Sequence, residues 1–401
     1  MPSSGRPAID YTSITTDCDL REYCRELAEC DSIAFDTEFV SEHTYRPVLC
    51  LIQVAAGGRL AVIDAMAVDD VTPFWEAVAR EGHQTIVHAG RSEVEFCLHA
   101  VGRRPNDLFD VQIAAGLIGL EFPASYRTLI SKLLGEKGGG HETRTDWRRR
   151  PLSERQIRYA LEDARHLHAM RDNLQSQLAQ LDRAPWLEEE MAVWLHEVEH
   201  GGKQSRWRKV SGSAGLDARS LAIVRELWNW RDTEAARLDK PPRRVLRDDL
   251  IVELARRRTA DVGRISAVRG FERRGLKRQL DAIAVCVQQA LDLPDDDCPQ
   301  RGPRRQRNQP TILGQFLFAA LGSVCRQAGL APSLVATPSD IRQLIAYRTR
   351  GADDKHEPPK LARGWRAEFV GHLFDRLLDG KTAIRIGDPA SDHPLIFEPE
   401  E

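Results

Sequence analysis

The stretch "DSIAFDTEFV", residues 31–40, places two acids inside an apolar, β-prone run. Side chains alternate between the faces of a strand, so Asp36 and Glu38 point the same way and their neighbours point into a core. An unpaired carboxylate is costly to bury, and two like charges on one face repel each other. A divalent metal ion would offset both effects, because Mg²⁺ favours a few carboxylate ligands. The alternative is a strand edge with two solvated acids.

The sequence around this stretch is typical of an α/β fold. Residues 32–65 contain three short β-prone runs, and the glycines at 57–58 predict a hairpin turn. Helical patterns at 72–82 and 92–102 then flank a short strand pattern at 85–90. This alternation predicts a mixed sheet with helices on its faces.

A second acidic motif is the segment "YALED", where Tyr159 and Asp163 are one helical turn apart. The pattern predicts a long helix from Pro151, with Ser153 and Gln156 forming a capping box at its start. A tyrosine one turn before a carboxylate can orient a water beside a metal ion. Alternatively, Asp163 pairs with a surface arginine and Tyr159 packs at a helix boundary.

A third acidic position follows the predicted strand in "IVHAGRSEVEFC". The strand should end at His88 and a helix should begin near Ser92, which places Glu93 and Glu95 in its first turns. Acids there suit the positive end of the helix dipole, so ordinary helix capping explains them. The functional interpretation is that Glu93 supplies a fourth carboxylate facing the acidic strand. Glu95 is the less favoured candidate.

The rest of the chain is predominantly helical in pattern. Helices are predicted throughout 206–292, and the proline-rich segment 293–310 has the composition of a linker. Helical patterns resume over 311–380, and the tail at 381–401 is expected to be extended. We therefore expect an α/β domain over residues 1–205, followed by two small helical modules.

Composition limits the class of protein. The 401 residues carry a net charge of −3, which argues against a general polycation but allows local basic patches. None of the eight cysteines forms a C-x-x-C pair, and we interpret them as reduced thiols of a cytosolic protein. No run approaches the ~20 apolar residues of a membrane helix, so we expect no membrane partner.

The order of the acidic motifs resembles the DEDD exonuclease superfamily, in particular its tyrosine-bearing branch and the ribonuclease D family. D-x-E comes first, then His-Ala-Gly with an acid, then Tyr-x-x-x-Asp. The approach to the last motif, "TRTDWRRRPLSERQIRYALEDARHL", is similar to that family as well. The helical region that begins with "WRKVSG" resembles an HRDC domain, and the part from Thr311 resembles a second one more weakly.

This resemblance implies an α/β ribonuclease H-like exonuclease domain followed by two all-α HRDC-like modules. It implies that two divalent metal ions, Mg²⁺ or Mn²⁺, are held by Asp36, Glu38, Glu93 and Asp163. It also implies that Tyr159 positions the attacking water. The family has aspartate at the position of Glu93, so this chain departs from the pattern by one methylene.

The activity implied by the resemblance is that of a monomeric 3′→5′ exoribonuclease. It would release nucleoside 5′-monophosphates while trimming tRNA precursors and other small structured RNAs. One alternative is a DNA-directed 3′→5′ exonuclease of the same superfamily, although the helicase motif G-x-x-x-x-G-K-[ST] is absent from the sequence. The other is a non-catalytic RNA-binding scaffold, for which Glu93 is the only support.

Substrate contact needs local positive charge. The arginines just before Tyr159 are expected to touch phosphates, with a solvated basic loop as the alternative. Residues beside the acids could contact the terminal nucleotide, and a basic stretch in the first helical module could bind the backbone. The candidate substrate contacts are Phe39, His88, Arg148, Arg149, Arg150, Arg273 and Arg274.

Overall fold

The computed structural model describes residues 9–136, 145–200, 206–272, 274–299, 312–350 and 357–399. Contacts divide the chain into two compact units. The first contains the chain up to Glu38, residues 50–198 and the chain from residue 310 onward, and the second contains residues 39–49 and 199–309. The glycine run at 138–140, most of the predicted linker and Arg273 lie outside the described residues, as does the side chain of Arg274.

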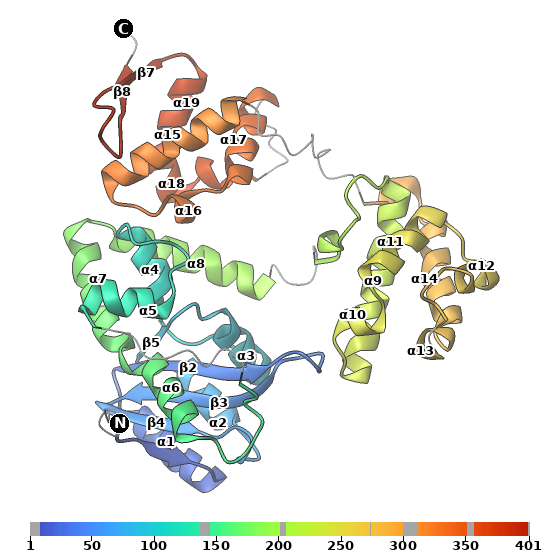
Figure 1. Cartoon of the computed structure of the whole chain (residues 1–401), viewed down its shortest axis with the longest axis horizontal. Helices are drawn as coiled ribbons and strands as arrows, with labels where there is room; N and C mark the ends of the chain where they lie inside the picture. Colours follow the sequence, from blue (N-terminus) through green and yellow to red (C-terminus); the bar gives the residue numbers. More distant parts are fainter. Residues whose placement is uncertain are drawn as a thin grey trace, which may run out of the picture. The chain divides into compact units, whose positions relative to one another are not determined.

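A mixed sheet forms the core of the α/β part of the first unit (Figure 1). In spatial order its strands are β1 (Thr12–Ile14), β4 (Arg59–Ile63), β3 (Val48–Ala56), β2 (Ser32–Val40), β5 (Gln84–Val87) and β6 (Leu108–Asp110). β3 and β4 are antiparallel and are joined by Gly57 and Gly58, both with positive φ. The pairs β1–β4, β2–β5 and β5–β6 are parallel. The predicted mixed sheet and its hairpin turn are confirmed, whereas β1 and β6 are too short to leave a sequence pattern.

Helices connect and cover these strands. They are α1 (Asp17–Leu27), α2 (Thr72–Ala79), α3 (Arg91–Val101), α4 (Val111–Leu117), α5 (Tyr126–Leu129) with the π-helical turn η1 (Ile130–Leu134), α6 (Glu154–Arg165), α7 (Leu167–Gln180) and α8 (Ala184–His200). The capping box of Ser153 and Gln156 is present at the start of α6. The single long helix predicted there is wrong, because the chain turns at His166, whose backbone N–H donates to the Tyr126 hydroxyl at 3.3 Å.

An aromatic cluster fixes one face of β2. The Phe35 ring meets Phe74 and Trp75 of α2 edge-on, with centroid distances of 5.3 and 5.9 Å. All three side chains are fully or almost fully buried. Edge-to-face packing of this kind adds to the free energy gained by burial alone. Because side chains alternate along a strand, this packing turns Asp36 and Glu38 toward the opposite face.

The C-terminal part of the chain belongs to the same unit as the sheet. It comprises α15 (Ile312–Ala328), α16 (Pro332–Val335), α17 (Pro338–Arg350), η4 (Lys360–Ala362), α18 (Gly364–Arg366), η5 (Ala367–Gly371) and α19 (His372–Leu378). An antiparallel hairpin of β7 (Thr382–Ile386) and β8 (Leu395–Pro399) follows. The tail expected to be extended therefore pairs with itself. The boundary at residue 311 stays a prediction, as does the likeness to a second HRDC domain.

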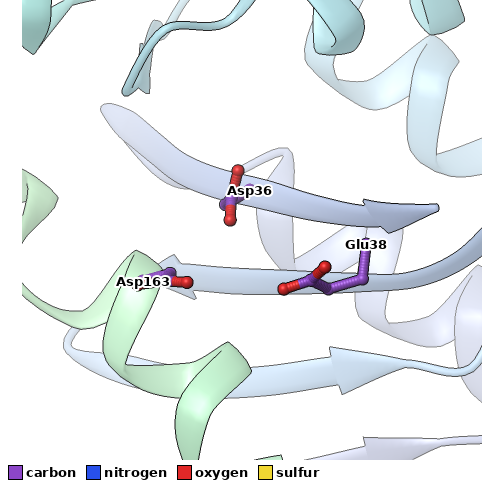
Figure 2. Close-up of side chains that lie close together, drawn as sticks. All are labelled: Asp36, Glu38 and Asp163. Atoms are coloured by element: carbon purple, nitrogen blue, oxygen red, sulfur yellow. The ribbon is translucent and has the colours of Figure 1, made fainter. Parts of the chain in front are cut away.

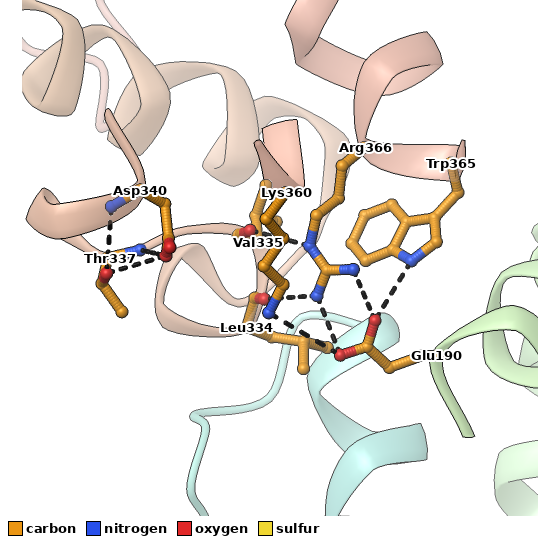
Figure 3. A network of polar contacts seen from close by, with 8 residues as sticks. All are labelled: Glu190, Leu334, Val335, Thr337, Asp340, Lys360, Trp365 and Arg366. Atoms are coloured by element: carbon orange, nitrogen blue, oxygen red, sulfur yellow. Dashed lines mark hydrogen bonds and ion pairs between the residues drawn. The ribbon is translucent and has the colours of Figure 1, made fainter. Parts of the chain in front are cut away.

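A buried ion pair joins these C-terminal helices to α8 (Figure 3). Arg366 donates from Nη2 to Glu190 Oε1 at 2.8 Å, and from Nε to the Val335 carbonyl at 2.8 Å. Burial raises the pKa of Glu190, but the hydrogen bonds and charge of Arg366 outweigh it and bring that pKa below its usual range. Beside the pair, the Trp186 and Trp365 rings stack with centroids 5.0 Å apart.

The second unit is built from helices packed around α9 (Ala218–Leu238). The others are η2 (Arg206–Lys209), α10 (Pro242–Val245), α11 (Asp248–Arg257), α12 (Val262–Ser266), α13 (Arg274–Lys277), α14 (Leu280–Asp292) and η3 (Asp295–Asp297). Leu227, Leu254 and Ile283 belong to its fully buried core. Arg231 pairs with Asp248 at 2.6 Å inside this unit. The helical pattern predicted over 206–292 is confirmed.

Arg366→Met should destabilise the protein strongly, because it leaves the buried Glu190 with only the more distant Lys360 and the Trp365 indole as partners. We expect the free energy of unfolding to fall by about 3 kcal/mol, measured by urea denaturation at neutral pH. Arg363→Met is the matched control, since Arg363 pairs with the exposed Glu357. An equal loss in both variants would contradict a special contribution from the buried pair.

Candidate functional site

Two acids of β2 lie on the face that the aromatic cluster leaves open. Asp36 and Glu38 are partly buried, whereas Thr37 between them is 6% exposed and points the other way. The structure thus gives the acidic stretch the alternation expected of a strand.

The helix α6 brings a third acid to them. Ala160, Leu161 and Ala164 are its buried residues, which turns Asp163 toward β2. Oxygen atoms of Asp36, Glu38 and Asp163 all lie within 4.8 Å of one another (Figure 2). Residues more than a hundred positions apart in the chain therefore form one cluster of carboxylates.

The fourth predicted acid lies outside this group. Glu93 lies in the first turn of α3 and is 4% exposed, and its Oε1 accepts a hydrogen bond from the Thr37 hydroxyl at 2.5 Å. Strand register explains its place, because Ala34 pairs with Ile86 and β5 ends one residue later. The segment after β5 therefore lies beside the second half of β2. Glu93 remains close enough to be one of the charges that raise the pKa of Asp36.

Each of three carboxylates receives a hydrogen bond from an uncharged side chain. Gln53 Nε2 donates to Asp36 Oδ2 at 2.9 Å, and Thr37 donates to Glu93. Tyr159, one turn before Asp163, hydrogen-bonds to its carboxylate. Uncharged donors orient a carboxylate without neutralising it. These hydrogen bonds therefore fix the geometry of the cluster without adding positive charge to it.

Burial and mutual repulsion shift the proton affinities of the whole cluster. Burial, followed by the charges of its acidic neighbours, raises the pKa of Asp36 well above its usual value. The same causes raise the pKa of Glu38 to about 8. Burial also raises the pKa of Asp163 to about 7 and that of Glu93 to about 7. Without a cation, ionising this site costs free energy.

The donor set fits a hard divalent cation. Oxygen ligands from several carboxylates, held by hydrogen bonds to neighbouring side chains, match the preferences of Mg²⁺ and Mn²⁺. A cation would also relieve the repulsion that raises these pKa values. The exonuclease family matched by this chain depends on divalent metals, and the cluster of acids is in place.

The residues before Glu93 are held by Asp110, which sequence reasoning missed. Its two carboxylate oxygens accept from the backbone N–H groups of Ala89 and Gly90, each at 3.0 Å. Ala89 has a positive φ of 54°, so this turn needs support. His88 lies half-buried beside it, with Nε2 3.0 Å from the Ala124 carbonyl. Phe39 ends the acidic stretch and is also half-buried.

The basic segment before α6 divides into anchored and exposed arginines. Arg150 donates to both oxygens of Asp64 and to the Cys50 carbonyl, which ties the segment to the sheet. Arg148 bonds to Asp146 at the surface, and Arg149 is exposed. Arg150 was expected to touch phosphate, but the structure commits its guanidinium to these protein groups. Trp147 packs against the Tyr159 ring, with centroids 6.2 Å apart.

Sequence reasoning also missed Gln53, Thr37 and Trp147. A single polar residue inside the apolar run "LCLIQVAA" was the one available signal for Gln53. Thr37 was interpreted as a core residue, and nothing local indicated its partner.

Within the part of the chain that the structure describes, no helix is long and apolar enough to cross a membrane.

Two family models match this chain. Residues 11–179 match the 3′-5′ exonuclease family, and residues 220–287 match the HRDC domain. The chain is 32% identical to ribonuclease D of Acidiphilium cryptum, over 96% of each protein. It is 32% identical to ribonuclease D of Jannaschia sp., over 93% of this chain and 96% of that protein.

A solved structure agrees with these sequence relationships. The crystal structure of Escherichia coli RNase D, described as an exoribonuclease involved in structured RNA processing, superposes with a TM-score of 0.80. It is 26% identical and covers 93% of this chain and 99% of that one. These findings favour an exoribonuclease over a DNA-directed exonuclease or a non-catalytic scaffold. The chain therefore belongs to the ribonuclease D family of 3′→5′ exoribonucleases.

Proposed function

We propose that Asp36, Glu38 and Asp163 are metal ligands of this 3′→5′ exoribonuclease. Glu93, in the first turn of α3, would be the fourth ligand. The observation that carries the proposal is the meeting of three carboxylates from β2 and α6 within 4.8 Å. Two divalent ions bound there would stabilise the attacking and leaving oxygens of the phosphodiester. The product of each turnover would be a nucleoside 5′-monophosphate.

Tyr159 would orient the attacking water. Burial and the neighbouring carboxylates raise the pKa of Tyr159, so its hydroxyl stays protonated at neutral pH. The residue therefore acts by hydrogen bonding and not by removing a proton. Its bond to Asp163 and its packing against Trp147 hold the phenol beside the acids. A fixed hydroxyl keeps the water in one position as the bond forms.

Substrates are proposed to be the 3′ ends of tRNA precursors and other small structured RNAs, bound by a monomer in the cytoplasm. The exposed Arg148 and Arg149 precede α6 and would contact phosphates near the site. Phe39 and His88 would contact the terminal nucleotide. Arg273 and Arg274 remain candidates for the backbone farther along the RNA, which an HRDC domain is suited to bind.

Asp36→Asn should abolish activity while stabilising the metal-free protein. We expect Mn²⁺-dependent release of mononucleotides from a 3′-labelled RNA to fall at least ~1000-fold, since a proposed ligand is lost. The raised pKa values mean that the unfolded chain ionises from about pH 4, while the folded site ionises only near pH 7–8. The free energy of unfolding of the wild type should therefore fall as the pH rises from about 4 to about 8. The free energy of unfolding of the variant should fall by about 2 kcal/mol less over the same range.

The matching control is the same unfolding series with added Mg²⁺, with EDTA as the blank. Divalent ions should stabilise the wild type at pH 8 and the variant much less, because stabilisation follows binding to the folded state. A variant that keeps full nuclease activity, or a wild type insensitive to Mg²⁺, would refute the assigned ligands.

Glu93→Asp tests the departure from the family pattern. The shorter side chain cannot reach the Thr37 hydroxyl as Glu93 does, and its carboxylate becomes available to a metal ion. We expect kcat to rise about two- to tenfold in Mg²⁺, because the orientation of a carboxylate tunes the metal that it binds. Glu93→Gln is the control and should lower kcat, because it removes the charge. An unchanged or lower rate for Glu93→Asp would show that glutamate fits this site.

Arg148→Ala combined with Arg149→Ala should weaken RNA binding and leave folding intact. We expect a higher KM and a decrease of about 1–2 in the slope of log Kd against log salt, because each lost phosphate contact removes about one unit. Arg150→Ala is the contrasting variant. It should lower Tm, since it releases the segment from Asp64. An unchanged salt slope in the double variant would assign both arginines to ordinary solvation.

A further inference from the structure

Gln53 is a buried amide at the back of the acidic cluster. It lies in β3, the strand next to β2, and has no solvent exposure. Its neighbours Ile52 and Val54 are equally buried, so the position could accommodate an apolar side chain. The amide instead donates from Nε2 to Asp36 Oδ2 at 2.9 Å.

The other end of the same amide is unsatisfied. Gln53 Oε1 is buried and has no hydrogen-bond partner among the residues that the structure describes. A buried carbonyl without a donor is destabilising, whereas an apolar residue of similar shape avoids that cost. The polar amide of Gln53 therefore does not stabilise the core. Violations of this kind are expected where a residue serves a site.

The hydrogen bond constrains the Asp36 carboxylate in a specific way. It ties one of the two oxygens to a rigid central strand, and this fixes the rotation of the carboxylate. The donor is uncharged, so it neutralises none of the charge that Asp36 offers to a cation. Lysine or arginine at this position would neutralise part of that charge. A hydroxyl on a shorter side chain would not span the distance between the strands.

We propose that Gln53 is a positioning residue that orients Asp36 for divalent metal binding, at a cost to the stability of the metal-free fold. This inference rests on the proposed role of Asp36 as a metal ligand. Partners that hydrogen-bond to metal ligands raise metal affinity by limiting the orientations that the ligand must give up on binding. Gln53 would thereby act on metal affinity and on kcat, and not on the binding of RNA.

Gln53→Met tests the inference, because methionine matches the volume and removes the donor. We expect the Mn²⁺ Kd, measured by the electron paramagnetic resonance of free Mn²⁺, to weaken about 10- to 100-fold. The Tm of the metal-free protein should stay the same or rise. The KM for RNA should be unchanged, and kcat should recover as Mn²⁺ is increased. A purely structural role would produce the opposite pattern, with a lower Tm and an unchanged Kd.

Two further variants separate the possible outcomes. Val54→Ala on the same strand should lower Tm and leave the Mn²⁺ Kd unchanged. Asp36→Asn should weaken Mn²⁺ binding, and adding Gln53→Met to it should have no further effect on Kd. If Asp36→Asn leaves the Kd unchanged, the proposed ligand set fails. If Asp36→Asn weakens binding and Gln53→Met does not, or if Gln53→Met fails to fold, this inference alone is overturned.

Discussion

Repulsion among the carboxylates of Asp36, Glu38 and Asp163 is the constraint to which the rest of the first unit responds. Their oxygens lie within 4.8 Å of one another, and burial raises the proton affinity of each. A cluster of this kind persists only if other interactions hold the elements that carry it. β2 is held from behind by the Phe35 cluster, and α6 by its own buried face and its capping box.

The hydrogen bonds around the acids also hold the carboxylates in place. Gln53, Thr37 and Tyr159 orient carboxylates without supplying positive charge. The carboxylates are therefore oriented by groups that add no positive charge, an arrangement that suits a divalent cation. Two arginines of the first unit have structural partners of their own. Arg150 anchors the segment before α6, and Arg366 neutralises Glu190 far from the acids along the chain.

Stability for this arrangement comes from both ends of the chain. The α/β part and the C-terminal helices form one compact unit, joined by the Glu190–Arg366 pair and the stacked rings of Trp186 and Trp365. Arg183 of the α/β part donates to the Gly329 carbonyl just after α15, at 2.7 Å. α8 therefore links the α/β part to a part of the chain that begins more than a hundred residues later.

Local pattern was sufficient for the main elements of the site. The alternation around Asp36 and Glu38, the capping box of α6 and the four-residue spacing of Tyr159 and Asp163 depend only on near neighbours in the chain. The alternation of strand and helix patterns predicted the mixed sheet in the same way. These features follow from backbone geometry that every strand and helix shares, whereas the family and the HRDC domain were inferred from resemblance.

Only the tertiary structure decided which side chains meet. The bond from Thr37 to Glu93 depends on β5 ending where β2 continues, and the bond from Gln53 to Asp36 depends on β3 lying beside β2. The partners of Arg150 and Arg366 depend in the same way on packing between distant segments. Sequence by itself determined the acidic strand, the start of α6 and the directions in which their side chains point. Strand register and helix docking determined their partners, because contacts between distant segments are set by the fold as a whole.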